Sequence, residues 1–190
     1  MLNQMLVFLL DTLLGLFSLA LLLRFYMQLV RAPYGNPVSQ FLMSITDFVV
    51  RPARRIIPSL RGIDLPTLLL AWLAQFALLA SVYMLQGYNF SSTMGIAAAG
   101  LSLLALLEII KMTLYIVMAA VIIQAVLSWV NPHSPLAPLL DSFTRPFLGV
   151  FRKRIPPIGN VDLSPFFILI VIQLLLFLVA GVEKGISRLF

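Results

Sequence analysis

The chain has 190 residues, of which 61% are hydrophobic and only 11% are charged. A soluble domain carries about 25% charged residues, so this chain cannot cover a globular surface with polar groups, and we expect lipid to surround most of it. With no cysteine and a single histidine, disulfides, thiol catalysis, iron–sulfur clusters and multi-histidine metal sites are excluded, and we expect no cofactor.

Residues 4–30 form the first predicted membrane span. The run is apolar apart from Asp11, Arg24 and Gln28. A helix of this length extends about 40 Å, which is enough to cross the hydrocarbon core. A segment with two prolines and a glycine follows, and we expect it to end the helix.

Residues 38–51 show a different pattern. Apolar side chains recur at the spacing of one helical face, and polar side chains fill the other face. The segment is too short to cross a bilayer, and Arg51, Arg54 and Arg55 lie at its end. We therefore expect an amphipathic helix in the membrane interface, with a re-entrant segment packed inside the protein as the alternative. Pro52 is expected to end or kink this helix.

Three further spans are predicted at residues 65–87, about 112–130 and 163–182. A second amphipathic helix is predicted at residues 135–151. The apolar run that contains the third span begins at residue 96 and is interrupted by Glu108 and Lys111. It is longer than one ordinary span. Its first part, residues 96–107, either lengthens the third helix or forms a short separate helix.

An internal repeat organises the chain. Residues 36–69 and 134–167 align without a gap at an offset of 98. The identical pairs are Pro37/Pro135, Leu42/Leu140, Ser44/Ser142, Thr46/Thr144, Arg54/Arg152, Ile57/Ile155, Pro58/Pro156, Asp64/Asp162 and Leu65/Leu163. Such a repeat predicts two copies of one structural unit.

The expected fold class is therefore an all-α membrane protein with about four transmembrane helices in two parallel repeats, each a span, an amphipathic interfacial helix and a span. The first repeat is expected at residues 1–90, a linker or extra apolar segment at 91–103, and the second repeat at 104–190. Five basic residues lie at 31–61 and four at 145–154, whereas 88–95 has none. This distribution predicts cytoplasmic repeat loops and periplasmic N- and C-termini.

The motifs of the second copy resemble the YGGT repeat: SWVNP at 128–132, FRKRIP at 151–156 and VDLSP at 161–165. The first copy, with RPARRIIP at 51–58 and IDLP at 63–66, resembles a more diverged one. It has Gln28-Leu29 in place of Ser-Trp, and Pro66-Thr67 where the second copy has Ser164-Pro165. The second copy is therefore the better carrier of any function that the pattern has.

Nearly the whole chain is similar to two-repeat, YggT-type bacterial inner-membrane proteins. The resemblance implies links to osmotic tolerance and potassium handling, to cell division and nucleoid or plastid organisation, and to cofactor assembly on a plastid cytochrome. It implies no catalytic residue that could be carried over to this sequence.

Two repeated charge pairs are the sharpest candidate feature. Arg54 and Asp64 lie ten residues apart, as do Arg152 and Asp162, and each aspartate comes just before a span. A carboxylate near a helix N-terminus is favoured by roughly 0.3–1 kcal/mol. We expect each arginine to pair with its aspartate and to hold the amphipathic helix against the next span. A docking or ion site at these residues is the functional alternative.

The basic run Arg152, Lys153 and Arg154, with the cluster Arg51, Arg54, Arg55 and Arg61 in the first copy, points to anionic lipid headgroups. The sequence shows no groove-entering helix and no aromatic platform on a polar surface, so we expect no direct binding of nucleic acid. The other expected partners are a membrane or cytoplasmic protein and further copies of this chain, in a homo-oligomer.

Three ionisable residues lie inside or at the edge of predicted spans, where such groups are candidates for function. Asp11 aligns with Lys111 at an offset of 100, so the two could pair between the repeats or reach the interface separately. Arg24 lies six residues from the predicted inner end of its span and is expected to extend to the interface.

No nucleophile-and-base arrangement is visible, so we expect no enzyme. The favoured function is a scaffold or assembly factor that acts through cytoplasmic basic amphipathic helices, in envelope, division or osmotic-stress processes. The alternative is transport or modulation of an ion such as potassium, or of an osmolyte. Gln75, Gln124 and Gln173 are the only strongly polar residues deep in the later spans, which makes a thin lining for a pore.

Overall fold

The computed structural model describes residues 1–32, 36–60, 62–88, 94–131, 134–154 and 162–187. Of the repeated motifs, Pro132, Ile155, Pro156 and Val161 lie outside these ranges, and so does Arg61 of the first basic cluster. The described residues form six helices and no strand, and the helices are α1 (Leu2–Leu29), α2 (Pro37–Ile56), α3 (Leu65–Leu85), α4 (Met94–Val130), α5 (Ala137–Arg152) and α6 (Ser164–Ser187).

Four of these helices, α1, α3, α4 and α6, are long and apolar enough to cross a membrane. Large apolar side chains cover their outer surfaces: Phe8 is 72% exposed and Phe177 is 79% exposed. A helix that is apolar on its outside as well as its inside is typical of a membrane span. The prediction of a multi-pass, all-α membrane protein with four spans is confirmed.

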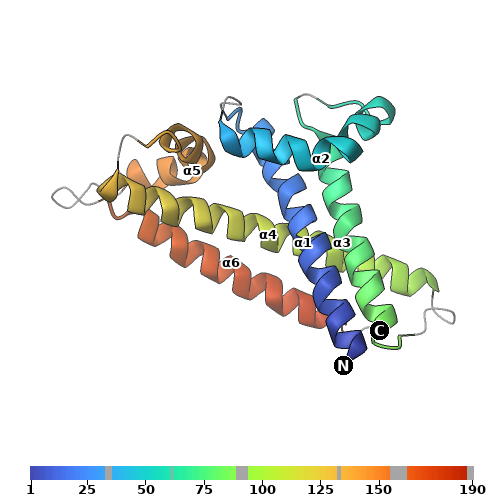
Figure 1. The fold of residues 1–190 in the computed structure, drawn as a ribbon. Coiled ribbons are helices and arrows are strands. Elements are labelled where there is room, and N and C mark those ends of the chain that lie inside the picture. Colours follow the sequence, from blue (N-terminus) through green and yellow to red (C-terminus); the bar gives the residue numbers. More distant parts are fainter. Residues whose placement is uncertain (33–35, 61, 89–93, 132–133, 155–161, 188–190) are drawn as a thin grey trace.

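The two repeats keep the same order of elements. In the first, α1 packs along α3; in the second, α4 packs along α6 (Figure 1). One cluster of buried residues includes Leu21, Ala71 and Ile116, and a second includes Val121 and Ile172. Because α4 contributes to both clusters, it joins the two repeats.

The two amphipathic helices lie on the same side of the molecule, at the top of Figure 1. α2 runs across the upper ends of α1 and α3, and α5 lies beside the C-terminal end of α4. The N-terminus and the end of α6 lie on the opposite side. The two repeats therefore place their amphipathic helices on the same side, although the pair α4 and α6 lies across the pair α1 and α3 in Figure 1.

The extra apolar segment lengthens the third span and is not a separate helix. α4 runs without interruption from Met94 to Val130. Its added part packs against α3, where the indole Nε1 of Trp72 donates a hydrogen bond to the carbonyl oxygen of Ser102 at 3.2 Å. Ala97, Leu101 and Leu104 are buried in the same part of α4. The segment is rich in alanine and leucine, which favour helix, and it contains no proline.

Pro52 does not end α2, which was one of the two effects expected of it. The helix continues through this proline to Ile56, and α5 likewise contains Pro146. The end comes where Ile57 adopts an extended conformation, with φ −115° and ψ 111°. Pro58 follows directly, and a proline disfavours the helical conformation in the residue before it. The later proline therefore sets the end of the helix.

Candidate functional site on the α2 and α5 surface

α2 is an amphipathic helix with a defined start. The side chain of Asn36 accepts a hydrogen bond from the backbone N–H of Ser39 at 2.9 Å, and Pro37 occupies the first turn. The buried residues of α2 recur every three or four positions and face the spans; they are Ser39, Leu42, Thr46 and Val50. Arg51 and Arg55 are exposed, so the outer face of the helix is basic.

Arg24 of α1 is buried beneath α2 and does not reach the interface as predicted. Its side chain is 9% exposed. Its guanidinium donates to Thr46 Oγ1 at 2.7 Å and to Asp47 Oδ1 at 2.8 Å. The other oxygen of Asp47 pairs with Arg51 at 2.6 Å. Because α2 supplies a carboxylate and a hydroxyl within reach, the guanidinium is satisfied without leaving the protein.

Asp47 is electrostatically tied to this contact. The hydrogen bond from Arg24 lowers the pKa of the Asp47 carboxyl, and burial opposes that shift without cancelling it. Arg51 adds a second favourable charge. Asp47 therefore holds its negative charge between two arginines, one from α1 and one from its own helix.

The second repeat has an uncharged version of this contact between a span and its amphipathic helix. Thr144 of α5 is fully buried and donates to the amide oxygen of Gln124 on α4. Gln124 occupies the position of Arg24 at an offset of 100, and Thr144 corresponds to Thr46 at an offset of 98. A span therefore contacts the threonine of its amphipathic helix in both copies, but only the first copy uses a charge.

The predicted pair of Arg54 and Asp64 is present. Arg54 donates from Nη2 to Asp64 Oδ2 at 2.5 Å and from Nε to Oδ1 at 3.3 Å. The side chain of Asp64 is fully buried and also accepts from the hydroxyl of Thr67. Arg54 donates further to Gln28 Oε1 at 2.9 Å. One guanidinium thus links α1, α2 and the start of α3.

The predicted pair of Arg152 and Asp162 is present as well, in a more open setting. Nε of Arg152 donates to Asp162 Oδ2 at 2.8 Å, and the two side chains are 46% and 38% exposed. The other carboxylate oxygen accepts from the backbone N–H of Ser164, at the start of α6. Burial alone would raise the pKa of Asp162, but the hydrogen bonds from Ser164 and Arg152 outweigh it and lower the pKa.

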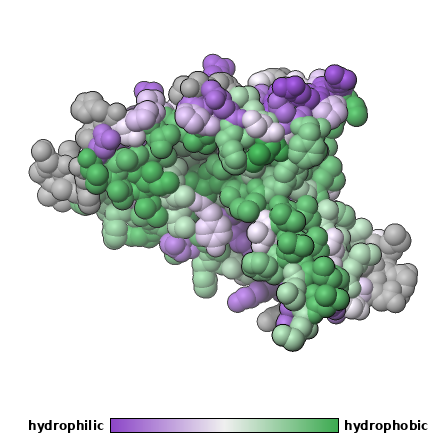
Figure 2. Space-filling model, in the orientation of Figure 1, coloured by the Kyte–Doolittle hydropathy of each residue, from purple (hydrophilic) through white to green (hydrophobic). Residues whose placement is uncertain are grey.

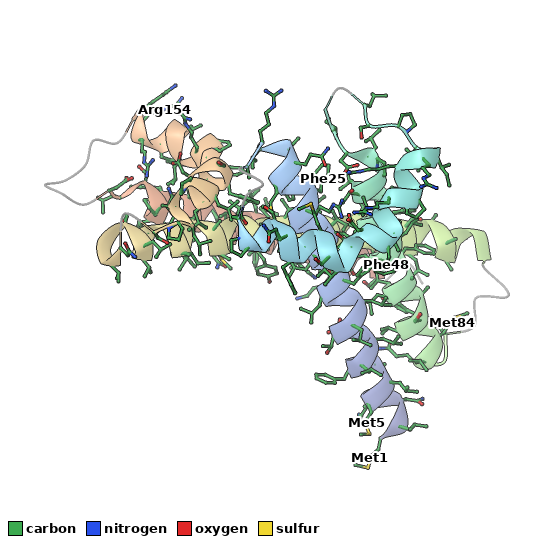
Figure 3. The ribbon with its side chains drawn as sticks, turned by 45° about the horizontal axis from the view of Figure 1, so that its top comes forward. Met1, Met5, Phe25, Phe48, Met84 and Arg154 are labelled. Carbon is green, nitrogen blue, oxygen red and sulfur yellow. The ribbon has the colours of Figure 1, made fainter. Side chains whose placement is uncertain are left out.

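The remaining basic residues form the outer surface of α2 and α5. Figure 2 shows hydrophilic side chains gathered along this side of the molecule, above a largely apolar body. Lys153 and Arg154 are exposed, and Arg154 points away from the bundle in Figure 3. Within the part of the chain that the structure describes, Arg55, Arg145, Lys153 and Arg154 form no ion pair. They are therefore available to an anionic surface.

The suggested pair of Asp11 and Lys111 does not form. Nζ of Lys111 contacts Glu108 at 2.5 Å and Glu183 of α6 at 3.0 Å. Asp11 instead lines a hollow of about 700 Å³ between α1, α3 and α4, together with Glu108. The repeat alignment placed the two residues at similar depth, but it does not determine which way each helix face points.

The three glutamines each take part in a separate contact between helices. Gln75 is buried, and its amide lies 3.3 Å from the sulfur of Met112. The amide of Gln173 lies 3.6 Å from the sulfur of Met118, and Gln124 accepts from Thr144. These contacts involve different pairs of helices, so they do not line one common path.

Sequence reasoning missed several polar partners in these contacts, above all Thr46, Asp47, Thr67 and Glu183. One signal was available for Thr46, because it is identical to Thr144 in the repeat alignment. Asp47 has no acidic counterpart, since Arg145 stands at its repeat position. Its role depends on the facing arginine in α1, which hydropathy does not reveal.

Comparison with known proteins yields one family. A model of the CCB3/YggT family matches residues 3–85 and 103–182, and each matched segment contains one span, one amphipathic helix and a second span. An uncharacterised protein of Pseudomonas aeruginosa is 39% identical over 92% of this chain and 87% of its own length. The uncharacterised Escherichia coli protein YggT is 32% identical over 97% of this chain and 94% of its own length. No solved structure matches.

Proposed function

The chain belongs to the CCB3/YggT family, and we propose that it is a non-enzymatic scaffold or assembly factor of the bacterial inner membrane. Its active surface is the basic outer side of α2 and α5, facing the cytoplasm. This surface contacts anionic lipid headgroups and recruits a membrane or cytoplasmic protein of the envelope, division or osmotic-stress machinery.

The observation that carries this proposal is that the two amphipathic helices are fastened to the spans in equivalent ways. Arg54 pairs with Asp64 at the end of α2, and Arg152 pairs with Asp162 at the end of α5. Arg54 and Arg152 are occupied in these pairs, whereas Lys153 and Arg154 are exposed and form no ion pair among the described residues. A helix held at both its buried side and its end presents a fixed pattern of charge, which suits recognition of a partner.

The proposed orientation rests on the distribution of basic residues. The loops with α2 and α5 contain most of the lysines and arginines, and basic loops stay in the cytoplasm. The cytoplasmic leaflet is rich in anionic lipids, which attract basic segments by about 1 kcal/mol per residue near the surface. An inner-membrane location with periplasmic termini follows from these two arguments.

The test is crosslinking in native membranes, followed by purification of the full chain and identification of what accompanies it. The informative variant replaces Lys153 and Arg154 with glutamate, because both are exposed and form no ion pair among the described residues. Lys184→Glu is the matched control, since Lys184 is exposed at the other end of the molecule. We expect a stoichiometric, salt-sensitive partner that the double variant loses and the control keeps. Equal recovery from both variants would refute the proposal.

A second candidate function, passage or modulation of potassium or an osmolyte, has one specific observation in its favour. The hollow between α1, α3 and α4 is lined by Asp11, Gln75 and Glu108, so polar groups meet within the span region. Potassium flux into proteoliposomes measures it directly. Flux that Asp11→Asn and Gln75→Leu abolish would favour this function over the scaffold, and absence of flux in the wild type would eliminate it.

A further inference from the structure

An apolar hollow of about 460 Å³ lies between the two repeats. Its walls come from α1 and α4, with Leu23 and Ala119 among them, and α2 and α5 contribute Leu42, Leu139 and Phe143. Both amphipathic helices therefore turn apolar side chains toward the same space. Apart from the tyrosine hydroxyl of Tyr115, the lining side chains carry no hydroxyl, amide or charge.

Two further hollows follow it along α5 toward the basic surface, each sharing lining residues with the one before. The first, of about 620 Å³, shares the walls Ile116 and Phe143 and adds Asp141 and Arg145. The second, of about 480 Å³, shares Arg145 with the first and adds Lys153 and Arg154, with no carboxylate among its lining residues. The lining of the series therefore changes from predominantly apolar to cationic along α5.

Water does not fill the apolar hollow well, because a buried water needs two to four polar partners. In a bilayer the hydrocarbon chains of lipids surround these helices and compete for the space. At the other end of the series, arginine and lysine side chains are the groups that bind phosphate oxygens, and arginine can do so through two parallel hydrogen bonds. One molecule that carries both features is a phospholipid.

We propose that this series of hollows binds one anionic glycerophospholipid taken from the surrounding bilayer. An acyl chain occupies the apolar hollow beside Ala119 and Phe143, and the phosphate headgroup lies at Arg145, Lys153 and Arg154. The carboxylate of Asp141 lines the same hollow as Arg145 and repels a phosphate there, so the headgroup is placed toward Lys153 and Arg154. The proposal shares the membrane position of α2 and α5 with the proposed function, but it does not depend on any protein partner.

The experiment is native mass spectrometry of the full chain released from nanodiscs of defined composition. The nanodiscs contain phosphatidylglycerol or phosphatidylcholine with the same acyl chains, or an equal mixture of the two. Ala119→Phe fills the apolar hollow from an exposed position. Ala98→Phe is the matched control, the same substitution at an exposed alanine of α4 outside the lining. Thermal unfolding of both variants in detergent shows whether they are folded.

The wild type is expected to retain one lipid and to favour phosphatidylglycerol in the mixture. Ala119→Phe is expected to lower the retained fraction at least tenfold, whereas Ala98→Phe behaves as the wild type. Replacing Arg145, Lys153 and Arg154 with glutamine is expected to abolish the headgroup preference, and Arg55→Gln is the control for a lost exposed cation. Because Ala119→Phe keeps every cation, it removes the lipid without removing a protein partner recruited by charge.

Three results would overturn the proposal. Equal lipid retention by Ala119→Phe and Ala98→Phe would show that no acyl chain occupies the hollow. Equal retention of phosphatidylglycerol and phosphatidylcholine by the wild type would refute the placement of the headgroup at Arg145, Lys153 and Arg154. A lipid-free dimer of the wild type that Ala119→Phe dissociates would assign the hollow to a second copy of the chain.

Discussion

The two repeated ion pairs should differ in their contribution to stability, although the sequence makes them equivalent. Asp64 is fully buried and is held by Arg54, whose own side chain is 38% exposed. Asp162 and Arg152 are 38% and 46% exposed. Arg54→Gln leaves a buried carboxylate with one hydroxyl partner, whereas Arg152→Gln leaves a carboxylate that water reaches.

The magnitudes follow from burial. Removing one partner of a buried ion pair costs about 3–5 kcal/mol, and the partial exposure of Arg54 places its loss near the lower end, at about 3 kcal/mol. An exposed pair is worth about 0–1 kcal/mol. We therefore expect Arg54→Gln to cost at least about 2 kcal/mol more than Arg152→Gln, which is roughly thirty-fold in the unfolding equilibrium.

The assay is reversible unfolding of the purified chain in mixed micelles by titration with sodium dodecyl sulfate, followed by circular dichroism. Arg54→Lys should lie between the wild type and Arg54→Gln, because lysine keeps the charge but loses the two-pronged contact. Equal losses in Arg54→Gln and Arg152→Gln, within about 0.5 kcal/mol, would refute the reasoning from burial.

Three other predictions concern the same contacts and the orientation. Arg24→Met should destabilise the chain by about 1.5–3 kcal/mol, the range for hydrogen bonds to a charged group, because Asp47 then keeps only its pair with Arg51. The loss should be smaller in an Asp47→Ala background, where the contact with Arg24 is already gone, and an equal loss in both backgrounds would argue against the pair. The pKa values of Asp47 and Asp162 are lowered in the folded chain, so their contribution to stability is present above the ordinary aspartate pKa of about 4 and is lost as the pH falls through the lowered values. The free energy of unfolding should therefore fall below about pH 4, and less steeply when both are replaced by asparagine. Because the chain has no cysteine, single cysteines report orientation: an impermeant maleimide should label Lys184→Cys in intact spheroplasts and Lys153→Cys only after permeabilisation, and the reverse pattern would invert the topology.

Hydropathy and the repeat determine most of the fold. Long apolar runs place the four spans to within a few residues, because a bilayer requires about 20 apolar residues for each crossing. The exception is α4, whose extra part is apolar on every side and so gives no signal of where one element would end. The two ion pairs could be predicted because their members are close together in the chain. Arg54 and Asp64, like Arg152 and Asp162, lie on either side of a short loop, and both residues are identical in the two copies.

The contacts that sequence could not supply depend on the direction in which a helix face points. Arg24 looked like a residue that reaches the interface, because depth along the helix was the only available measure. The structure turns it toward Asp47 on α2. Lys111 likewise meets Glu183, which is distant in sequence and comes close only because α6 packs along α4.

The two repeats have diverged in a way that separates two tasks. In the first copy, α2 is held by two charged contacts, Arg24 with Asp47 and the buried pair of Arg54 and Asp64. In the second copy, α5 is held by the neutral contact of Thr144 with Gln124 and by an exposed ion pair. Among the described residues, α5 and its end have three exposed cations without an ion pair, Arg145, Lys153 and Arg154, whereas α2 has only Arg55. The first copy therefore contributes more to holding the fold, and the second copy, which also carries the fuller motif, presents the larger free charge.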